Sequence, residues 1–113
     1  MINIIVVPET SDFIKSTIYS LEVYINKTLG VPQIKKRNVK YLAPFWLDKN
    51  KRGVDRVFYI KSMKNNKICL GNSFVLDNNW DKISQTRKFE YAHLESFGFI
   101  EIKDGILMKY NFK

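Results

Sequence analysis

The sequence has few of the residues on which most catalytic and metal sites are built. Its 113 residues include one cysteine, Cys69, and one histidine, His93. The chain therefore cannot build a zinc site from several Cys or His ligands or form an internal disulfide. The five glycines stand alone, so there is no glycine-rich loop of the kind that holds phosphates. We expect no metal and no cofactor, and we favour a non-enzymatic function.

Long hydrophobic runs are also missing. No apolar run approaches the roughly 20 residues needed to span a bilayer. The N-terminal MINIIVV has a short apolar run without a basic segment before it, and Pro8 and Glu9 follow at once. This pattern predicts a strand rather than a signal peptide. Together with the single cysteine it indicates a cytoplasmic protein with no membrane partner. The length predicts one domain, residues 1–113.

Positive charge, in contrast, is plentiful and concentrated in the middle of the chain. The net charge is +8, and residues 35–67 carry eleven Lys and Arg against Asp48 and Asp55, a net charge of +9. Residues 1–34 have a net charge of −1, and residues 68–113 are balanced. Such a concentration favours a surface that meets an anion.

Aromatic residues alternate with these cations, which favours nucleic acid as the anion. Cations bind phosphates, and exposed rings stack on unpaired or flipped bases. We therefore predict a surface that binds RNA or DNA, with a modified base among the candidate ligands. The alternative is that the rings fill the core and the lysines simply face water. The candidate contact residues are Lys35, Lys36, Arg37, Lys40, Tyr41, Trp46, Lys49, Lys51, Arg52, Arg56, Tyr59 and Lys61.

The hydrophobic pattern predicts an α+β fold. Strands joined by short turns favour a small, mostly antiparallel sheet or a small β-barrel over a parallel doubly wound sheet. Tight hairpin turns are expected at Lys64-Asn65-Asn66 and at Asp104-Gly105. The expected strands are Ile2–Val7, Val39–Leu47, Arg56–Met63, Lys67–Leu70, Phe74–Leu76, Phe99–Lys103 and Ile106–Phe112.

One or two helices should flank the sheet. The first begins with Thr10 or Ser11 as its cap and ends before Gly30, with an apolar stripe at Ile14, Ile18, Leu21, Ile25 and Leu29. The second is expected within residues 80–97, although Lys88–Ala92 is equally compatible with a strand. Asp77-Asn78-Asn79 before it has the composition of a turn.

Residues 53–60, Gly-Val-Asp-Arg-Val-Phe-Tyr-Ile, followed by a turn and Leu70-Gly71, resemble the strand signature of PUA-like domains of the ASCH and EVE kind. The likeness covers about residues 39–76, and Val54 is inserted between the Gly and the Asp of the family pattern. It implies a small β-barrel with flanking helices that binds RNA or modified DNA bases in a pocket beside the barrel. Trp46 and Tyr59 would be the candidate pocket aromatics.

Two other functions remain open from the sequence. A small phage or mobile-element protein that inhibits a host nucleic-acid enzyme by protein contact would also be compact, charged and without an active site. A Mg²⁺-dependent nuclease would need two carboxylates and a lysine, for which Glu101, Lys103 and either Asp77 or Asp81 are candidates. We instead expect Glu101 and Lys103 to lie on a solvent-facing strand surface.

Overall fold

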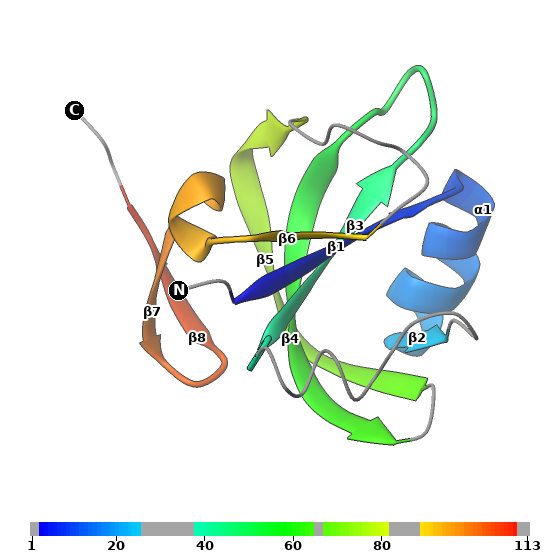
Figure 1. Ribbon diagram of the computed structural model, residues 1–113. Helices are drawn as coiled ribbons and strands as arrows, with labels where there is room; N and C mark the ends of the chain where they lie inside the picture. The colour runs from blue at the N-terminus through cyan, green and yellow to red at the C-terminus, as the bar shows by residue number, and fades with distance from the viewer. Residues whose placement is uncertain (1–2, 26–37, 65–66, 82–88, 111–113) are drawn as a thin grey trace.

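The computed structural model describes residues 3–25, 38–64, 67–81 and 89–110. Its described strands form a six-stranded sheet, in the order β2-β5-β4-β3-β1-β6, and a separate two-stranded sheet, β7-β8 (Figure 1). The strands are β1 (Ile4–Glu9), β2 (Val23–Ile25), β3 (Tyr41–Trp46), β4 (Val54–Lys64), β5 (Lys67–Trp80), β6 (Glu90–Ala92), β7 (Phe99–Lys103) and β8 (Ile106–Lys109). The helical segments are α1 (Ser11–Phe13), η1 (Ile14–Tyr19) and η2 (Leu94–Phe97).

The α+β class and the mostly antiparallel sheet are confirmed. Only β1 and β3 pair in parallel among the described strands, and every other pair is antiparallel. Of the two architectures expected, the sheet is confirmed and the β-barrel is wrong, because the six described strands form an open sheet with β2 and β6 at its edges. Strong curvature of β4 and β5 gives the sheet its half-rolled shape (Figure 1). Three register shifts along this pair are consistent with that bending.

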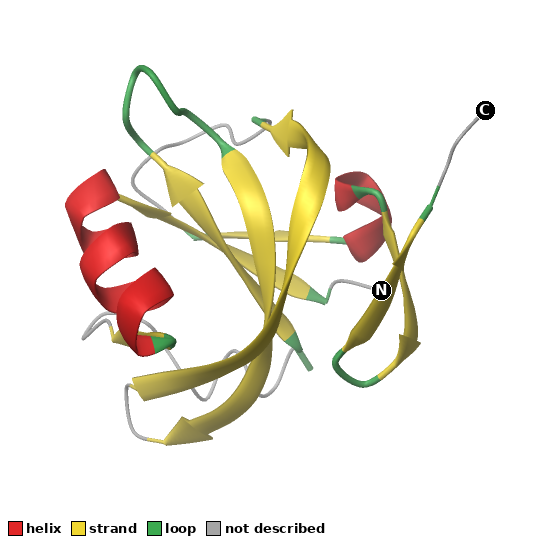
Figure 2. Ribbon diagram, turned by 180° about the vertical axis from the view of Figure 1, so that it is seen from behind, coloured by secondary structure: helices red, strands yellow, loops and turns green. Residues whose placement is uncertain are grey.

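The central strands of the large sheet are buried on both faces. Alternate residues of β1 enter two separate clusters, Ile5 and Val7 on one face and Ile4 and Val6 on the other. The α1–η1 helix covers the first face, and η2 with the β7–β8 hairpin covers the second (Figure 2). This explains why β1 and β3 read as unbroken apolar runs rather than as alternating ones.

The N-terminal helix is much shorter than predicted. Thr10 caps it as expected, with Oγ1 accepting from the Phe13 amide at 3.4 Å. Glu22 has a left-handed φ of 55°, and residues 23–25 pair with β5. Leu21 of the predicted stripe is 64% exposed. Pairing with β5 therefore ends the helix, although the apolar residues continue at helical spacing. Leu29 lies outside the described residues.

The central hairpin is confirmed, but its second strand is longer than predicted. β5 runs without a break from Lys67 through Gly71 to Trp80, so Phe74–Leu76 is not a separate strand. Residues 77–79, expected to form a turn, are the last part of this strand. The turn residues Asn65 and Asn66 lie outside the described residues.

The C-terminal part combines a confirmed hairpin with a strand that the sequence allowed as the alternative to a helix. β7 and β8 pair across Asp104-Gly105, with Gly105 at a φ of 80°. Of the two alternatives for residues 88–92, the strand is confirmed at Glu90–Ala92, where β6 pairs with β1, and a helix follows at Leu94–Phe97. No helix in the described part of the chain is long and apolar enough to cross a membrane.

Candidate nucleic-acid interface

Two aromatic residues expected to face nucleic acid are part of the core. Tyr41 is 0% exposed and Trp46 is 2% exposed. Both lie on β3, an interior strand whose two faces are covered, so neither ring can present a face to a base. The prediction that Trp46 and Tyr41 are contact residues is therefore corrected.

The buried Trp46 belongs to a cluster of hydrogen bonds around Asp55. Its Nε1 donates to Asp55 Oδ1 at 3.1 Å, and the Tyr19 hydroxyl donates to the same oxygen at 3.0 Å. Lys51 Nζ lies 3.0 Å from Asp55 Oδ2 and 4.1 Å from the Trp46 ring centroid. Lys51 is thus partly neutralised by a neighbour within the molecule.

These contacts determine the charge state of Asp55. Burial alone raises the pKa of this carboxyl group, but hydrogen bonds from Lys51, Tyr19 and Trp46 outweigh burial and lower the pKa below its ordinary value. Burial, followed by the nearby Asp55 charge, raises the pKa of Tyr19. Tyr19 therefore remains a neutral donor, and Asp55 remains an ionised acceptor at neutral pH.

Lys40, Tyr41 and Tyr59 hold the β7–β8 hairpin against the large sheet. Lys40 Nζ is 2.7 Å from Asp104 Oδ1, and this hydrogen bond raises the pKa of the lysine. The Tyr41 hydroxyl donates to Glu101 Oε2 at 2.7 Å and accepts from the Gly105 amide at 3.1 Å. A Cβ on Gly105 would lie 3.1 Å from the Tyr59 ring. Two further predicted contact residues, Lys40 and Tyr59, thus have partners within the protein.

The same contacts bear on the nuclease alternative. Glu101 points inward to Tyr41 rather than lying on a solvent face, so that expectation is wrong. Lys103 is exposed as expected. Within residues 3–25, 38–64, 67–81 and 89–110 no cluster of three or more His, Cys, Asp or Glu could hold a metal ion.

The loop between β3 and β4 carries the next group of predicted cations. Lys49 is exposed, Arg52 Nε lies 3.2 Å from Asp81 Oδ2, and the Arg56 guanidinium lies 4.9 Å from the Tyr19 ring centroid. The Asn79 side-chain amide donates to the Arg52 carbonyl oxygen. We call residues 49–52 the basic loop. This hydrogen bond fixes the basic loop to the end of β5.

Lys61 lies apart from the basic loop, at an exposed position near the far end of β4. No ion pair or side-chain hydrogen bond to it exists within the described parts of the chain. The remaining predicted cations, Lys35, Lys36 and Arg37, lie outside the described residues. Their contact with nucleic acid stays a prediction.

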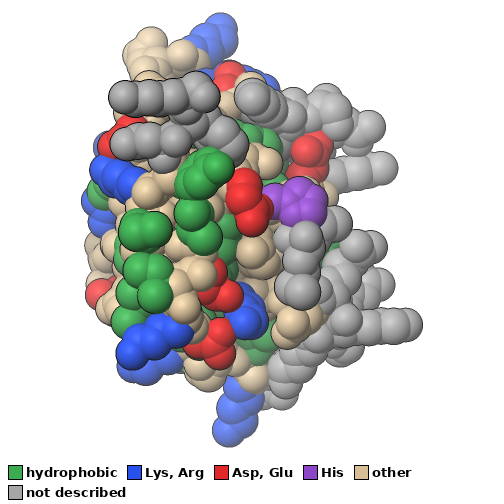
Figure 3. All heavy atoms as spheres, turned by 90° about the vertical axis from the view of Figure 1, so that its left-hand side faces the viewer, with side chains coloured by type: hydrophobic (Ala, Val, Ile, Leu, Met, Phe, Trp, Pro, Cys, Tyr) green, Lys and Arg blue, Asp and Glu red, His purple; other side chains and the backbone are tan. Residues whose placement is uncertain are grey.

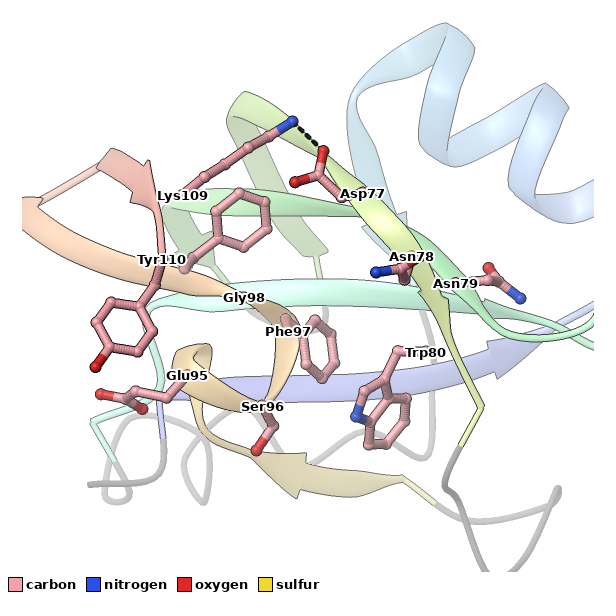
Figure 4. A pocket seen from close by; sticks show the side chains of 11 residues that line it. Asp77, Asn78, Asn79, Trp80, Glu95, Ser96, Phe97, Gly98, Lys109 and Tyr110 are labelled. Carbon is pink, nitrogen blue, oxygen red and sulfur yellow. Dashed lines mark hydrogen bonds and ion pairs between the residues drawn. The ribbon is translucent and has the colours of Figure 1, made fainter. Parts of the chain in front are cut away.

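The structure also contains a pocket that the sequence did not indicate. It is an open hollow of about 770 Å³ between the end of β5, η2 and β8 (Figure 4). Ligand pockets usually have volumes of about 300–1,000 Å³. Its lining residues are Asp77, Asn78, Asn79, Trp80, Glu95, Ser96, Phe97, Gly98, Phe99, Lys109 and Tyr110.

The wall of this pocket combines aromatic rings with polar groups. The Trp80 and Phe97 ring centroids are 4.8 Å apart, with planes inclined by 35°. The Trp80 Nε1–H is buried and has no hydrogen-bond partner in the part of the chain that the structure describes. Lys109 Nζ pairs with Asp77 Oδ1 at the rim. The pocket thus presents the partly buried Trp80 ring next to several polar groups, while Phe97, which is 5% exposed, packs against Trp80.

Sequence reasoning missed this pocket because its parts are far apart in the chain. Trp80 was read as the start of a helix, whereas it ends β5 and meets residues 94–99 and 109–110 only after folding. The Asn78-Asn79-Trp80 run was the one local signal, since it places amides beside an aromatic ring.

Comparison with known proteins provides no family assignment. No protein-family model matches the chain, and no curated protein or solved structure matches it. The likeness of residues 39–76 to PUA-like domains therefore remains untested.

Proposed function

We propose that this protein binds nucleic acid without catalysis, seating one base in the pocket around Trp80 while the basic loop contacts phosphates. The observation that carries this proposal is the pocket itself. Its volume, the partly buried Trp80 ring and the amide side chains of Asn78 and Asn79 suit a planar ligand with polar edges. The likeness to PUA-like domains favours the same class of ligand.

The pocket supplies both kinds of contact that a base requires. Every base has a face that can stack on an aromatic ring, and one stacked base is worth about 1–3 kcal/mol. Asn78, Asn79 and Ser96 provide hydrogen-bonding groups for its edge.

The basic loop lies beside this pocket. Asn79, which lines the pocket, holds the Arg52 carbonyl oxygen, and Val54 pairs with Trp80 in the sheet register. Phosphates on either side of a seated base would therefore meet the basic loop, where Lys49 is exposed. Lys51 and Arg52 contribute less than Lys49, because they are paired with Asp55 and Asp81.

Binding to short single-stranded, double-stranded and modified-base oligonucleotides tests the proposal. Asn78→Ala removes a polar pocket group from an exposed position, and the loss of one hydrogen bond predicts a roughly 2- to 10-fold weaker complex. Asn72→Ala is a matched control, since Asn72 is exposed on the same strand but outside the pocket. Absence of binding to every oligonucleotide at low salt would overturn the proposal. We place this activity in the cytoplasm, where the lone Cys69 stays reduced.

A second candidate function is inhibition of a host nucleic-acid enzyme by protein contact. The outer face of the β7–β8 hairpin carries an apolar patch of Ile102, Ile106, Met108 and Tyr110, of which Ile102 is 61% exposed. Hydrophobic side chains gather on this side of the molecule (Figure 3). Contiguous exposed apolar patches often mark protein interfaces.

This candidate is tested by adding the protein to assays of purified DNA- and RNA-processing enzymes. The double substitution Ile102→Glu and Met108→Glu should abolish inhibition while leaving oligonucleotide binding unchanged. Inhibition that survives this substitution would exclude the patch as the contact surface.

A further inference from the structure

The end of the β4–β5 hairpin carries three lysines that have no partner within the described residues. Lys61, Lys64 and Lys67 are all exposed, and none makes an ion pair or side-chain hydrogen bond there. Lys40 and Lys51, in contrast, are each paired with a carboxylate. Three of the cations in the described central segment that lack a carboxylate partner therefore lie together at this end of the hairpin, while Lys49 lies apart from them in the basic loop.

The register places two of these lysines in direct opposition. Lys64 on β4 and Lys67 on β5 are Cα partners. Like charges directly opposite one another on neighbouring strands destabilise a sheet. An anion bound between them would remove this repulsion.

We propose that Lys61, Lys64 and Lys67 form a second nucleic-acid contact, which we call the lysine tip. It binds the phosphate backbone and does not read bases. This inference rests on the proposed function and adds a site to it. No aromatic side chain is among the three residues, so the contact depends on charge alone.

The position of the lysine tip predicts a dependence on ligand length. Lys67 and Trp80 are the two ends of β5, a 14-residue strand. A straight strand of this length spans about 40 Å at ~3.3 Å per residue, which is an upper limit because β5 is curved. At a stacked spacing of ~3.4 Å per phosphate, about 12 nucleotides would cover that distance. A 20-nucleotide strand is therefore long enough to reach both sites, whereas a tetranucleotide spans only about 14 Å at the same spacing.

The experiment measures the affinity of the full chain for a fluorescent 20-nucleotide single strand and a tetranucleotide as the salt concentration rises. The double substitution Lys64→Gln and Lys67→Gln removes two phosphate contacts. The slope of log K against log salt should become shallower by about 1.4 for the 20-nucleotide strand and stay unchanged for the tetranucleotide. The control, Lys15→Gln with Lys103→Gln, lowers the net charge equally at two exposed positions outside both sites and should leave the slope unchanged.

A third variant separates binding from folding. Lys64→Glu places a carboxylate opposite Lys67, so it replaces a repulsive pair by an attractive one. The midpoint of thermal unfolding should stay equal or rise, while affinity for the 20-nucleotide strand falls. A fall in both quantities would mean that the substitution damages the hairpin. The salt slope of the Lys64→Gln, Lys67→Gln variant then decides whether the lysine tip binds phosphates.

The outcomes distinguish this inference from the proposed function. The wild-type chain could bind the 20-nucleotide strand while the Lys64→Gln, Lys67→Gln variant and the control variant show the same salt slope. In that case the lysine tip is wrong and the proposed function stands. If the tip pair alone flattens the slope and Asn78→Ala has no effect, the tip stands and the base pocket is wrong. If the wild-type chain binds neither oligonucleotide, both proposals are overturned.

Discussion

At the scale of single residues, Asp55 is the shared hydrogen-bond acceptor of three neighbouring side chains. Its carboxylate receives hydrogen bonds from Tyr19, Trp46 and Lys51, which come from the helix, β3 and the basic loop. Three donors to one half-buried acceptor favour its ionised form. Asp55, which lies in the stretch that resembles the PUA-like signature, therefore joins side chains from three parts of the fold.

Asp55 should make the stability of the protein sensitive to acid. Because its pKa is lower in the folded chain than the unfolded value of about 3.9, its contribution is fully present above that pH. It is lost as the pH falls through the folded pKa. The free energy of unfolding, measured against pH, should therefore fall more steeply below about pH 4 for the wild type than for Asp55→Asn. Parallel curves for the two proteins would contradict this assignment.

Trp46 should behave as a core residue. Trp46→Ala removes a buried ring that packs on Tyr19 and a donor to Asp55, so we expect a loss of about 3–5 kcal/mol of unfolding free energy. The fraction that remains folded should bind oligonucleotides as tightly as the wild type does. Denaturant unfolding and binding titrations on the same preparation check both statements. Weakened binding without loss of stability would restore Trp46 as a contact residue.

At the scale of elements, the β7–β8 hairpin is docked by a polar contact. The Tyr41 hydroxyl bridges Glu101 and the Gly105 amide, and Lys40 pairs with Asp104 in the connecting turn. Burial, followed by the hydrogen bond to Glu101, raises the pKa of Tyr41, so the hydroxyl stays a donor. The hairpin also forms one wall of the pocket, so its docking affects the proposed binding site.

Removing this hydroxyl should loosen the hairpin. Tyr41→Phe keeps the ring but leaves the buried Gly105 amide without its acceptor, which should cost about 1–3 kcal/mol of unfolding free energy. Hydrogen exchange should accelerate in β7 and β8 more than in β4. Lys103→Ala, at an exposed position of the same hairpin, is the control and should change stability by less than about 0.5 kcal/mol. An equal acceleration of exchange in both variants would refute the docking role.

At the scale of the whole molecule, net charge and fold stability act against each other. A chain with a net charge of +8 repels itself in its compact state, and the lysine tip concentrates part of that repulsion. Ion pairs such as Arg52–Asp81 offset some of it but are half-exposed and individually weak.

Salt should therefore stabilise the protein. Raising the ionic strength from 10 to 100 mM shortens the Debye length from about 30 to about 10 Å. The midpoint of thermal unfolding should rise by roughly 2–4 °C over this range, which corresponds to less than about 1 kcal/mol. Lys64→Glu should reduce the rise because it removes charge from the tip. A midpoint that falls with salt would show that ion pairs outweigh the net repulsion.

Features that depend on short stretches of chain could be predicted from the order of the residues. The Asp104-Gly105 hairpin, the Thr10 cap and the β4–β5 pairing followed from turn residues, capping chemistry and apolar patterning, which act over a few neighbouring positions. The positive charge of residues 35–67 was equally a property of composition.

Tertiary structure alone decided which side chains are exposed and which are paired. Trp46 and Tyr41 stand among cations in the sequence, as the aromatic residues of a nucleic-acid-binding surface would. The α1–η1 helix and the β7–β8 hairpin nevertheless cover the two faces of β3 and bury both rings. Trp80 became part of a pocket only because β5, η2 and β8 meet at one place. Burial and pairing depend on contacts between residues far apart in the chain, and a local pattern does not contain those contacts.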